Sequence, residues 1–249
     1  MQVEIKRDGL ILRGELTGTT QMQCDEIALL LHGFKGNIGS ERTNLLYDVN
    51  QELNKAGLPT LRVNFNGCGT SDGKFEDMTV LNEIQDTIAM LEFIKKEIKP
   101  KKIYLVGHSQ GGVVASMVAA MYPDIIEKLV LLAPAATLVD DAKKGICQGV
   151  SYDPKHIPDI VEVDGFRVGG AYFRVAQNLK IYETAKSYQR PTLLVHGLAD
   201  TIVSCSASQK YAQVYQNATL HLIEGASHGL RGSGNQRQET LKLVREFLS

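Results

Sequence analysis

The residues Val106-Gly107-His108-Ser109-Gln110-Gly111-Gly112 separate two apolar segments of different kinds. Residues 102–106 are short and partly β-branched, which predicts a strand, and residues 113–121 are long enough to predict a buried helix. A serine at such a turn takes a strained backbone conformation, and glycines two positions away on either side let the strand and the helix approach. We therefore expect the Ser109 hydroxyl to stand exposed above a sheet. The alternative is a glycine-rich turn without chemistry, and the context favours the first interpretation.

The rest of the chain alternates between strand and helix patterns. An Asp8-Gly9 turn joins residues 3–6 and 10–16 in an opening hairpin. Continuous apolar runs predict buried strands at residues 26–31, 58–65, 128–133, 192–196 and 219–223. Helical spacing predicts three helices. The first is capped by Ser40, stops at Gly57 and has apolar residues at Leu45, Leu46, Val49 and Leu53. The second begins at Thr79, with Leu81, Ile84, Ile88, Leu91 and Ile98 on one stripe, and the third covers residues 236–248. This order predicts a mostly parallel central sheet with helices on both faces.

Some fifty residues separate the strand at 128–133 from the strand at 192–196. An interval of that length is more often a lid or cap than an idle loop, so we expect an inserted cap over approximately residues 135–188, after the sixth strand. Alternating residues 161–168 around Asp164-Gly165 predict a small hairpin within it, and residues 171–179 predict a short helix. No linker divides the chain, which predicts a single domain over residues 1–249.

Composition excludes several classes of function. The chain has 249 residues, is 43% hydrophobic and carries a net charge of -1, without a long basic run, so we expect neither a nucleic-acid surface nor a membrane anchor. No apolar run reaches about eighteen residues, which favours a cytoplasmic protein. Four widely spaced cysteines predict free thiols rather than disulfides or a metal site, at Cys24, Cys68, Cys147 and Cys205. We expect no metal and no cofactor.

A serine nucleophile needs a base, and the base needs a third group to fix its tautomer. His228 is the histidine that lies after the last predicted strand, and Asp200 follows the strand that ends at residue 196. Ser109, Asp200 and His228 occur in the chain order of the α/β-hydrolase fold, so we predict that they form a catalytic triad. In the alternative, Asp200 caps the stretch from Ile202 and His228 is an ordinary loop histidine.

Other residues near the site have different predicted roles. The backbone N–H of Gln110, next to the nucleophile, and that of Phe34, after an early strand, are the expected oxyanion-hole donors. We expect His32 to shape its loop by a hydrogen bond and His108 to pack beneath the turn. Asp72 is the rival acid, and its glycine-rich surroundings favour a role in a turn.

Several longer motifs resemble one family. They are His32-Gly33-Phe34, the loop from Asn64 to Phe75, Gly107-His108-Ser109-Gln110-Gly111-Gly112, Leu131-Leu132-Ala133-Pro134-Ala135, Gln148-Gly149-Val150 and residues 215–226. Together they resemble the bacterial intracellular feruloyl (cinnamoyl) esterases of the α/β-hydrolase superfamily, over nearly the whole chain.

The resemblance implies hydrolysis of hydroxycinnamate esters, with the cap over the acyl pocket. It also implies that Asp141 and Gln148 contact the ring hydroxyl of the acyl group, and that the chain forms a homodimer. Residues 229–235 depart from the family because they are glycine-rich and lack aromatic residues.

The sequence is also compatible with other functions. The same triad would serve a short-acyl esterase, a monoacylglycerol lipase or a thioesterase. The other alternative is a hydrolase-fold binding protein without turnover, which has no need of all three triad residues. The partner in the main interpretation is a small aromatic ester.

Overall fold

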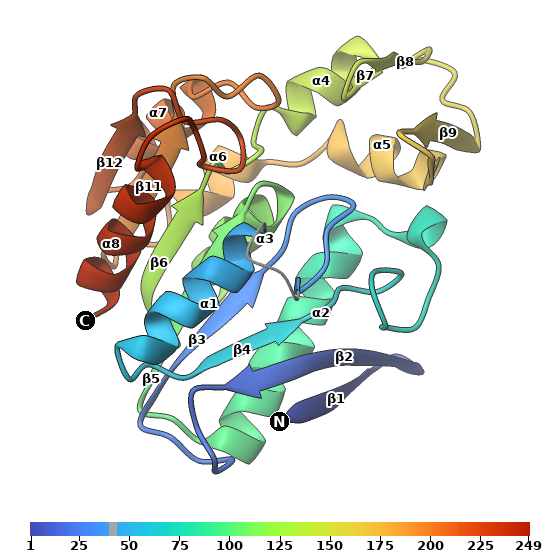
Figure 1. Ribbon diagram of the computed structural model, residues 1–249. Helices are drawn as coiled ribbons and strands as arrows, with labels where there is room; N and C mark the ends of the chain where they lie inside the picture. Colours follow the sequence, from blue (N-terminus) through green and yellow to red (C-terminus); the bar gives the residue numbers. More distant parts are fainter. Residues whose placement is uncertain (40–43) are drawn as a thin grey trace.

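An eight-stranded sheet forms the centre of the computed structural model, which describes residues 1–39 and 44–249 (Figure 1). Its strands lie in the order β1-β2-β4-β3-β5-β6-β11-β12. They are β1 (Gln2–Arg7), β2 (Leu10–Thr17), β3 (Glu26–Leu31), β4 (Thr60–Val63), β5 (Lys102–His108), β6 (Ile126–Leu132), β11 (Thr192–Gly197) and β12 (Ala218–Ile223). β1 and β2 pair antiparallel with their neighbours, and all other pairs are parallel. This is the α/β-hydrolase fold that the sequence predicts.

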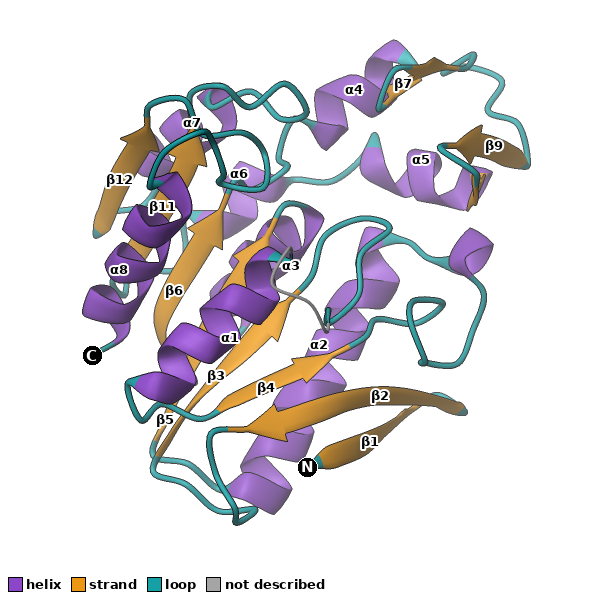
Figure 2. Ribbon diagram, viewed as in Figure 1, coloured by secondary structure: helices purple, strands orange, loops and turns teal. Residues whose placement is uncertain are grey.

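Helices cover both faces of the sheet, as Figure 2 shows. Apolar residues of α1 (Leu45–Lys55) and α8 (Gln236–Leu248) share one buried cluster with side chains such as Leu30 and Val106. The opposite face packs against α2 (Val80–Phe93), α3 (Gln110–Met121), α6 (Ile181–Ala185) and α7 (Ser206–Val214). Alternate residues of β3 point to opposite faces, so Leu29 and Leu30 belong to different clusters.

Two predicted helices differ in detail from their prediction. The side chain of Asn44 caps α1 by accepting from the N–H groups of Leu46 and Tyr47, whereas the predicted cap Ser40 lies outside the described residues. Thr79 caps α2 as predicted. The prediction that Leu81 belongs to the buried stripe of α2 was wrong, because this side chain is 47% exposed and the buried face includes the polar residues Glu83 and Asp86 instead.

We call the segment between β6 and β11, residues 133–191, the insertion. Its helices α4 (Leu138–Lys144) and α5 (Gly170–Ala176) and its two hairpins lie beyond the carboxyl ends of the parallel strands, whereas its last helix, α6, packs on the face of the sheet (Figure 1). The hairpin of β9 (Ile160–Val163) and β10 (Phe166–Gly169) is confirmed, with positive φ at both Asp164 and Gly165. The predicted helix at 171–179 is α5 (Gly170–Ala176), and α4 (Leu138–Lys144) and a hairpin of β7 (Ile146–Cys147) and β8 (Val150–Ser151) precede it.

Two ion pairs and an aromatic contact hold the β9–β10 hairpin against the core. Lys35 lies 2.6 Å from Asp164, and Arg167 donates to Glu76 in the short 3-10 turn Phe75–Asp77 at 2.7 Å. The ring of Phe166 meets that of Phe75 edge-on at 5.0 Å. The insertion is therefore fixed beside the loops that follow β3 and β4. Among the described residues, no helix has both the length and the apolar character needed to span a bilayer.

Candidate active site

Ser109 occupies the turn between β5 and α3 in a strained conformation, with φ +57° and ψ -122°. The residues two positions away on either side must be glycines, and a Cβ at Gly107 would lie 2.2 Å from the carbonyl oxygen of Gly111. A Cβ at Gly111 would lie 2.4 Å from the carbonyl oxygen of His32. The strand and the helix thus approach as closely as the motif predicts, and Ser109 stands at the carboxyl end of the sheet.

The structure brings Ser109, His228 and Asp200 together in one hydrogen-bonded series. The His228 Nε2 lies 2.9 Å from the Ser109 Oγ, and its Nδ1 lies 2.7 Å from the Asp200 Oδ2. Because a carboxylate only accepts, Nδ1 carries the proton, and Nε2 is left to accept from the serine hydroxyl. Asp200 lies in the loop after β11, and His228 lies in the loop after β12. These two strands are parallel neighbours, so their following loops meet at the same edge of the sheet.

The side chain of Asp200 is fully buried and accepts four hydrogen bonds from described residues. Its Oδ1 accepts from the N–H groups of Ile202 and Val203, so it also holds the turn that the alternative interpretation describes. Its Oδ2 accepts from His228 and from the Nε2 of His196 at 3.1 Å. Burial alone would raise the pKa of Asp200, but the donors outweigh burial and hold that pKa well below its usual range. Asp200 is therefore a carboxylate at neutral pH.

The contact of His196 with Asp200 is absent from the sequence predictions. His196 ends the apolar run of β11 and precedes Asp200 by four residues, a spacing that in a strand and turn does not by itself indicate contact. The signal in the sequence is a histidine at a position where a fully buried strand otherwise has apolar residues.

The rival residues have structural contacts, as predicted. Asp72 accepts from the N–H of Ile11 and from Arg13, which ties its loop to β2. The His108 Nε2 donates to the carbonyl oxygen of His228, and burial and the nearby His228 lower the pKa of His108 to about 3. His108 is therefore neutral and supports the loop that carries His228.

His32 shapes its loop, in agreement with the prediction. Its Nδ1 lies 2.9 Å from the carbonyl oxygen of Gly33, and its Nε2 accepts from the N–H of Phe65 at 3.1 Å. Burial lowers the pKa of His32 to about 4, so both contacts belong to the neutral ring. A Cβ at Gly33 would lie 2.8 Å from the Cβ of Ser109, and the backbone before Phe34 therefore runs directly against the serine. Among the described residues, none accepts from the N–H of Phe34 or of Gln110.

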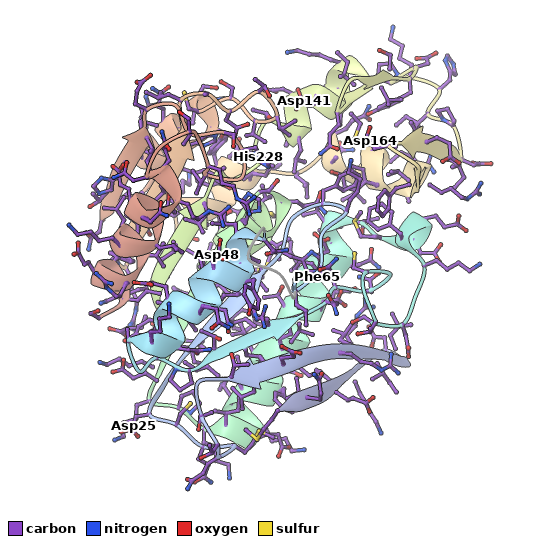
Figure 3. The ribbon with its side chains drawn as sticks, in the orientation of Figure 1. Asp25, Asp48, Phe65, Asp141, Asp164 and His228 are labelled. Carbon is purple, nitrogen blue, oxygen red and sulfur yellow. The ribbon has the colours of Figure 1, made fainter. Side chains whose placement is uncertain are left out.

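A narrow cavity extends from Ser109 into the insertion. Asp141 and Gln148 both line it, together with Phe34, Leu138, Ala142, Cys147, Tyr172, Phe173 and Val203. Figure 3 shows Asp141 on the insertion, on the side of the sheet's carboxyl end where His228 lies. Burial raises the pKa of Asp141. Gln148 sits at a two-residue turn with Gly149, and both have positive φ.

The floor of this cavity is held by a buried hydrogen-bond chain. The Tyr172 hydroxyl donates to the Gln110 Oε1 at 2.7 Å, and the Gln110 Nε2 donates to Glu83 at 2.8 Å. The rings of Tyr172 and Phe34 stack at 5.2 Å. α5 of the insertion therefore contacts the side chains of both residues whose backbone N–H groups are the expected oxyanion-hole donors.

A second cavity, of about 430 Å³, also borders Ser109. Phe34, Ser109 and Gln148 border both cavities. The second is more polar, since Asn37, Asn44, His108, Ser227, Arg231 and Arg237 contribute to it. Within the described parts of the chain, no group of three His, Cys, Asp or Glu residues could hold a metal ion.

Comparisons with known proteins identify the class. The family model of the alpha/beta hydrolase fold matches residues 29–155, just over half of the chain. The structure of Est1E from Butyrivibrio proteoclasticus with ferulic acid bound superposes with a TM-score of 0.91 at 34% identity, covering 99% of this chain and 97% of Est1E. The chain belongs to the α/β-hydrolase fold family.

Curated relatives place it among the esterases of that family. Putative esterase/lipase 2 of Mycoplasma pneumoniae is 28% identical over 80% of this chain and 81% of the relative. Monoacylglycerol lipase ABHD6 of Rattus norvegicus is 22% identical over 89% of this chain and 74% of the relative. The chain is a carboxylic ester hydrolase, and its resemblance to bacterial α/β-hydrolase esterases is confirmed.

Proposed function

We propose that this protein hydrolyses esters of hydroxycinnamic acids through an acyl-enzyme on Ser109. The observation that carries the proposal is the cavity that joins Ser109 to Asp141 and Gln148 in a chain 34% identical to a protein solved with ferulic acid. An aromatic acid with a polar ring substituent suits a cavity that is lined mainly by apolar side chains and carries a few polar ones.

In the proposed first half-reaction, the Ser109 Oγ attacks the ester carbonyl while the His228 Nε2 takes the hydroxyl proton. Asp200 holds the Nδ1 proton and stabilises the imidazolium without becoming protonated. The N–H groups of Phe34 and Gln110 donate to the oxyanion of the tetrahedral intermediate, and loss of one such donor typically costs about a hundredfold to a thousandfold in kcat. His228 then returns its proton to the departing alcohol.

The second half-reaction runs the same steps with water. Water attacks the acyl-enzyme as His228 takes a proton from it, the oxyanion forms at the same two amides, and the bond to the Ser109 Oγ breaks. Ser109 recovers its proton from His228, and the free acid leaves. The nucleophile and the base are within hydrogen-bond reach, which supports both halves.

We assign the ring hydroxyl of the acid to Asp141 and Gln148. A partly buried carboxylate is a strong acceptor for a phenol, and burial raises the pKa of Asp141 in spite of the opposing effects of Thr137 and Lys144. Gln148 offers both a donor and an acceptor at the boundary of the two cavities.

The test compares kcat/KM for methyl ferulate, a saturated aliphatic ester of matched length and a thioester of ferulic acid. These ratios report differential binding in the transition state. We expect methyl ferulate to exceed the aliphatic ester by about tenfold or more, which corresponds to about 1.4 kcal/mol. A higher kcat/KM for the aliphatic ester or for the thioester would contradict the proposed substrate class while leaving an ester hydrolase in place.

A further inference from the structure

We infer that His196 is a positioning residue of this site, which acts through Asp200 and never touches the substrate. The inference rests on the proposed function, since it assigns Asp200 to the orientation of His228. Its basis is the arrangement of hydrogen bonds around one carboxylate oxygen.

The Asp200 Oδ2 is shared by two imidazole rings. The His228 Nδ1 lies 2.7 Å from it and the His196 Nε2 lies 3.1 Å from it. The other oxygen, Oδ1, is held by two backbone N–H groups. Both oxygens turn together about the Cβ–Cγ bond, so the backbone bonds to Oδ1 and the His196 bond to Oδ2 together fix the carboxylate plane. His196 is the donor besides His228 that acts on Oδ2, the oxygen that faces the base.

The tautomer of His196 is determined by its surroundings. Its Nε2 faces two acceptors, the Asp200 Oδ2 and the carbonyl oxygen of Val203 at 3.0 Å, and must therefore carry the proton. Its Nδ1 lies 2.7 Å from the hydroxyl of Ser208 in α7, which donates to it when the ring is neutral. The series Ser208, His196, Asp200, His228, Ser109 thus runs from α7 to the nucleophile without a break.

His196 has no direct access to a substrate. Its side chain is completely buried, and it lines neither of the two cavities that meet at Ser109. After the opposing effect of burial, its hydrogen bond is the largest influence that lowers the pKa of Asp200. The His196 hydrogen bond therefore helps to keep Asp200 ionised, so that its Oδ2 can accept from the His228 Nδ1.

The experiment measures kcat and KM with p-nitrophenyl acetate, so the result does not depend on the identity of the natural acid. We expect His196→Phe, which keeps a flat ring of similar size, to lower kcat about tenfold to a hundredfold, the range for a hydrogen bond to a charged group. KM should change less than about twofold, and His196→Gln, which restores an N–H donor, should recover kcat to within about fivefold. An unchanged kcat in His196→Phe would overturn the inference.

A double-mutant cycle with Asp200→Asn distinguishes positioning from general support of the fold. If His196 acts through Asp200, His196→Phe should lower kcat less than about twofold in the Asp200→Asn background. The same loss in both backgrounds would overturn the inference. If His196→Phe does not fold, Ser208→Ala replaces it in the cycle, because the hydroxyl reaches Asp200 through His196.

The controls separate this inference from the proposed function. Turnover at the wild-type rate in Ser109→Ala or Asp200→Asn would refute the proposed mechanism itself. Loss of turnover in both of these variants, with full activity in His196→Phe, would refute the role of His196 alone.

Discussion

The change Asp200→Asn tests the proposed mechanism most directly, because the surroundings of Asp200 dictate how the amide must sit. Two backbone N–H groups, of Ile202 and Val203, point at Oδ1 and require an acceptor there. The amide oxygen therefore takes that place and turns its NH₂ group toward His228 and His196. The NH₂ group then faces the Nε2–H of His196, so two donors oppose each other there. Toward His228 the NH₂ group donates, so the His228 Nδ1 must accept.

That rearrangement puts the remaining proton of His228 on Nε2, where it faces Ser109. A protonated Nε2 cannot take the serine proton, so the base has the wrong tautomer. The same substitution in a serine-protease triad lowers kcat by about 10⁴ with the geometry intact, which corresponds to about 5.4 kcal/mol of transition-state stabilisation. We expect a loss of that size here.

The assay is kcat for methyl ferulate and for p-nitrophenyl acetate, with the circular dichroism spectrum as a check of folding. Asp72→Asn is the matched control, because Asp72 also accepts from a backbone N–H but holds a loop away from His228. We expect its kcat to stay within about threefold of the wild type. A folded Asp200→Asn enzyme within tenfold of wild-type kcat would refute the tautomer argument.

Three further predictions concern other residues. Ser109→Ala should abolish ester turnover and labelling by a fluorophosphonate probe, with folding retained. Near-wild-type hydrolysis in this variant would refute the assignment of Ser109 as the nucleophile. Asp141→Ala should lower kcat/KM for methyl p-coumarate about tenfold while leaving methyl cinnamate, which lacks the ring hydroxyl, within about twofold; equal losses on both esters would refute the assigned contact. Burial raises the pKa of Glu83 well above its ordinary value. The contribution of this group to the free energy of unfolding is therefore largest at acid pH and is lost as the pH rises through the folded-state pKa. Glu83→Gln does not titrate and should gain stability relative to wild type from pH 5 to pH 8 in urea unfolding, and a difference independent of pH would contradict this.

Local chemistry explains which parts of the fold the sequence predicts. Ser109 is predictable because its strained turn requires glycines at fixed positions on both sides. The β9–β10 hairpin is predictable because Asp164-Gly165 suits a turn with positive φ at both residues. Gln148-Gly149 makes a similar turn, but glutamine rarely has positive φ, so the β7–β8 hairpin gives a weaker signal.

Contacts between distant residues escape such reasoning. The hydrogen bonds of Gln110 to Tyr172 and Glu83 join residues 62 and 27 positions apart, and only the packing of α5 and α2 against the start of α3 creates them. The exposure of Leu81 has the same origin, since the buried face of α2 follows its neighbours rather than its own apolar spacing. The chain order predicts Asp200. The contact between Asp200 and His196 cannot be predicted in this way, because it depends on how the loop after β11 folds back against the end of that strand.

The insertion contributes differently to the two sides of Ser109. Attack on an ester places the carbonyl at Ser109, so the acid and the alcohol must extend in different directions. The cavity toward Asp141 has most of its walls in the insertion, and the Lys35–Asp164 ion pair and the Tyr172–Gln110 hydrogen bond fix those walls to the core.

The opposite cavity is built mainly by the loops after β3 and β12. There Arg237 is held by an ion pair with Asp48 and donates to the carbonyl oxygens of Gly229 and Leu230, so it fixes the loop of His228. Gly229 and Arg231 of the glycine-rich loop line this cavity, whereas none of residues 229–235 is among those that line the cavity toward Asp141. We therefore expect substitutions in residues 229–235 to change kcat/KM with the leaving alcohol, and substitutions in the insertion to change kcat/KM with the acid.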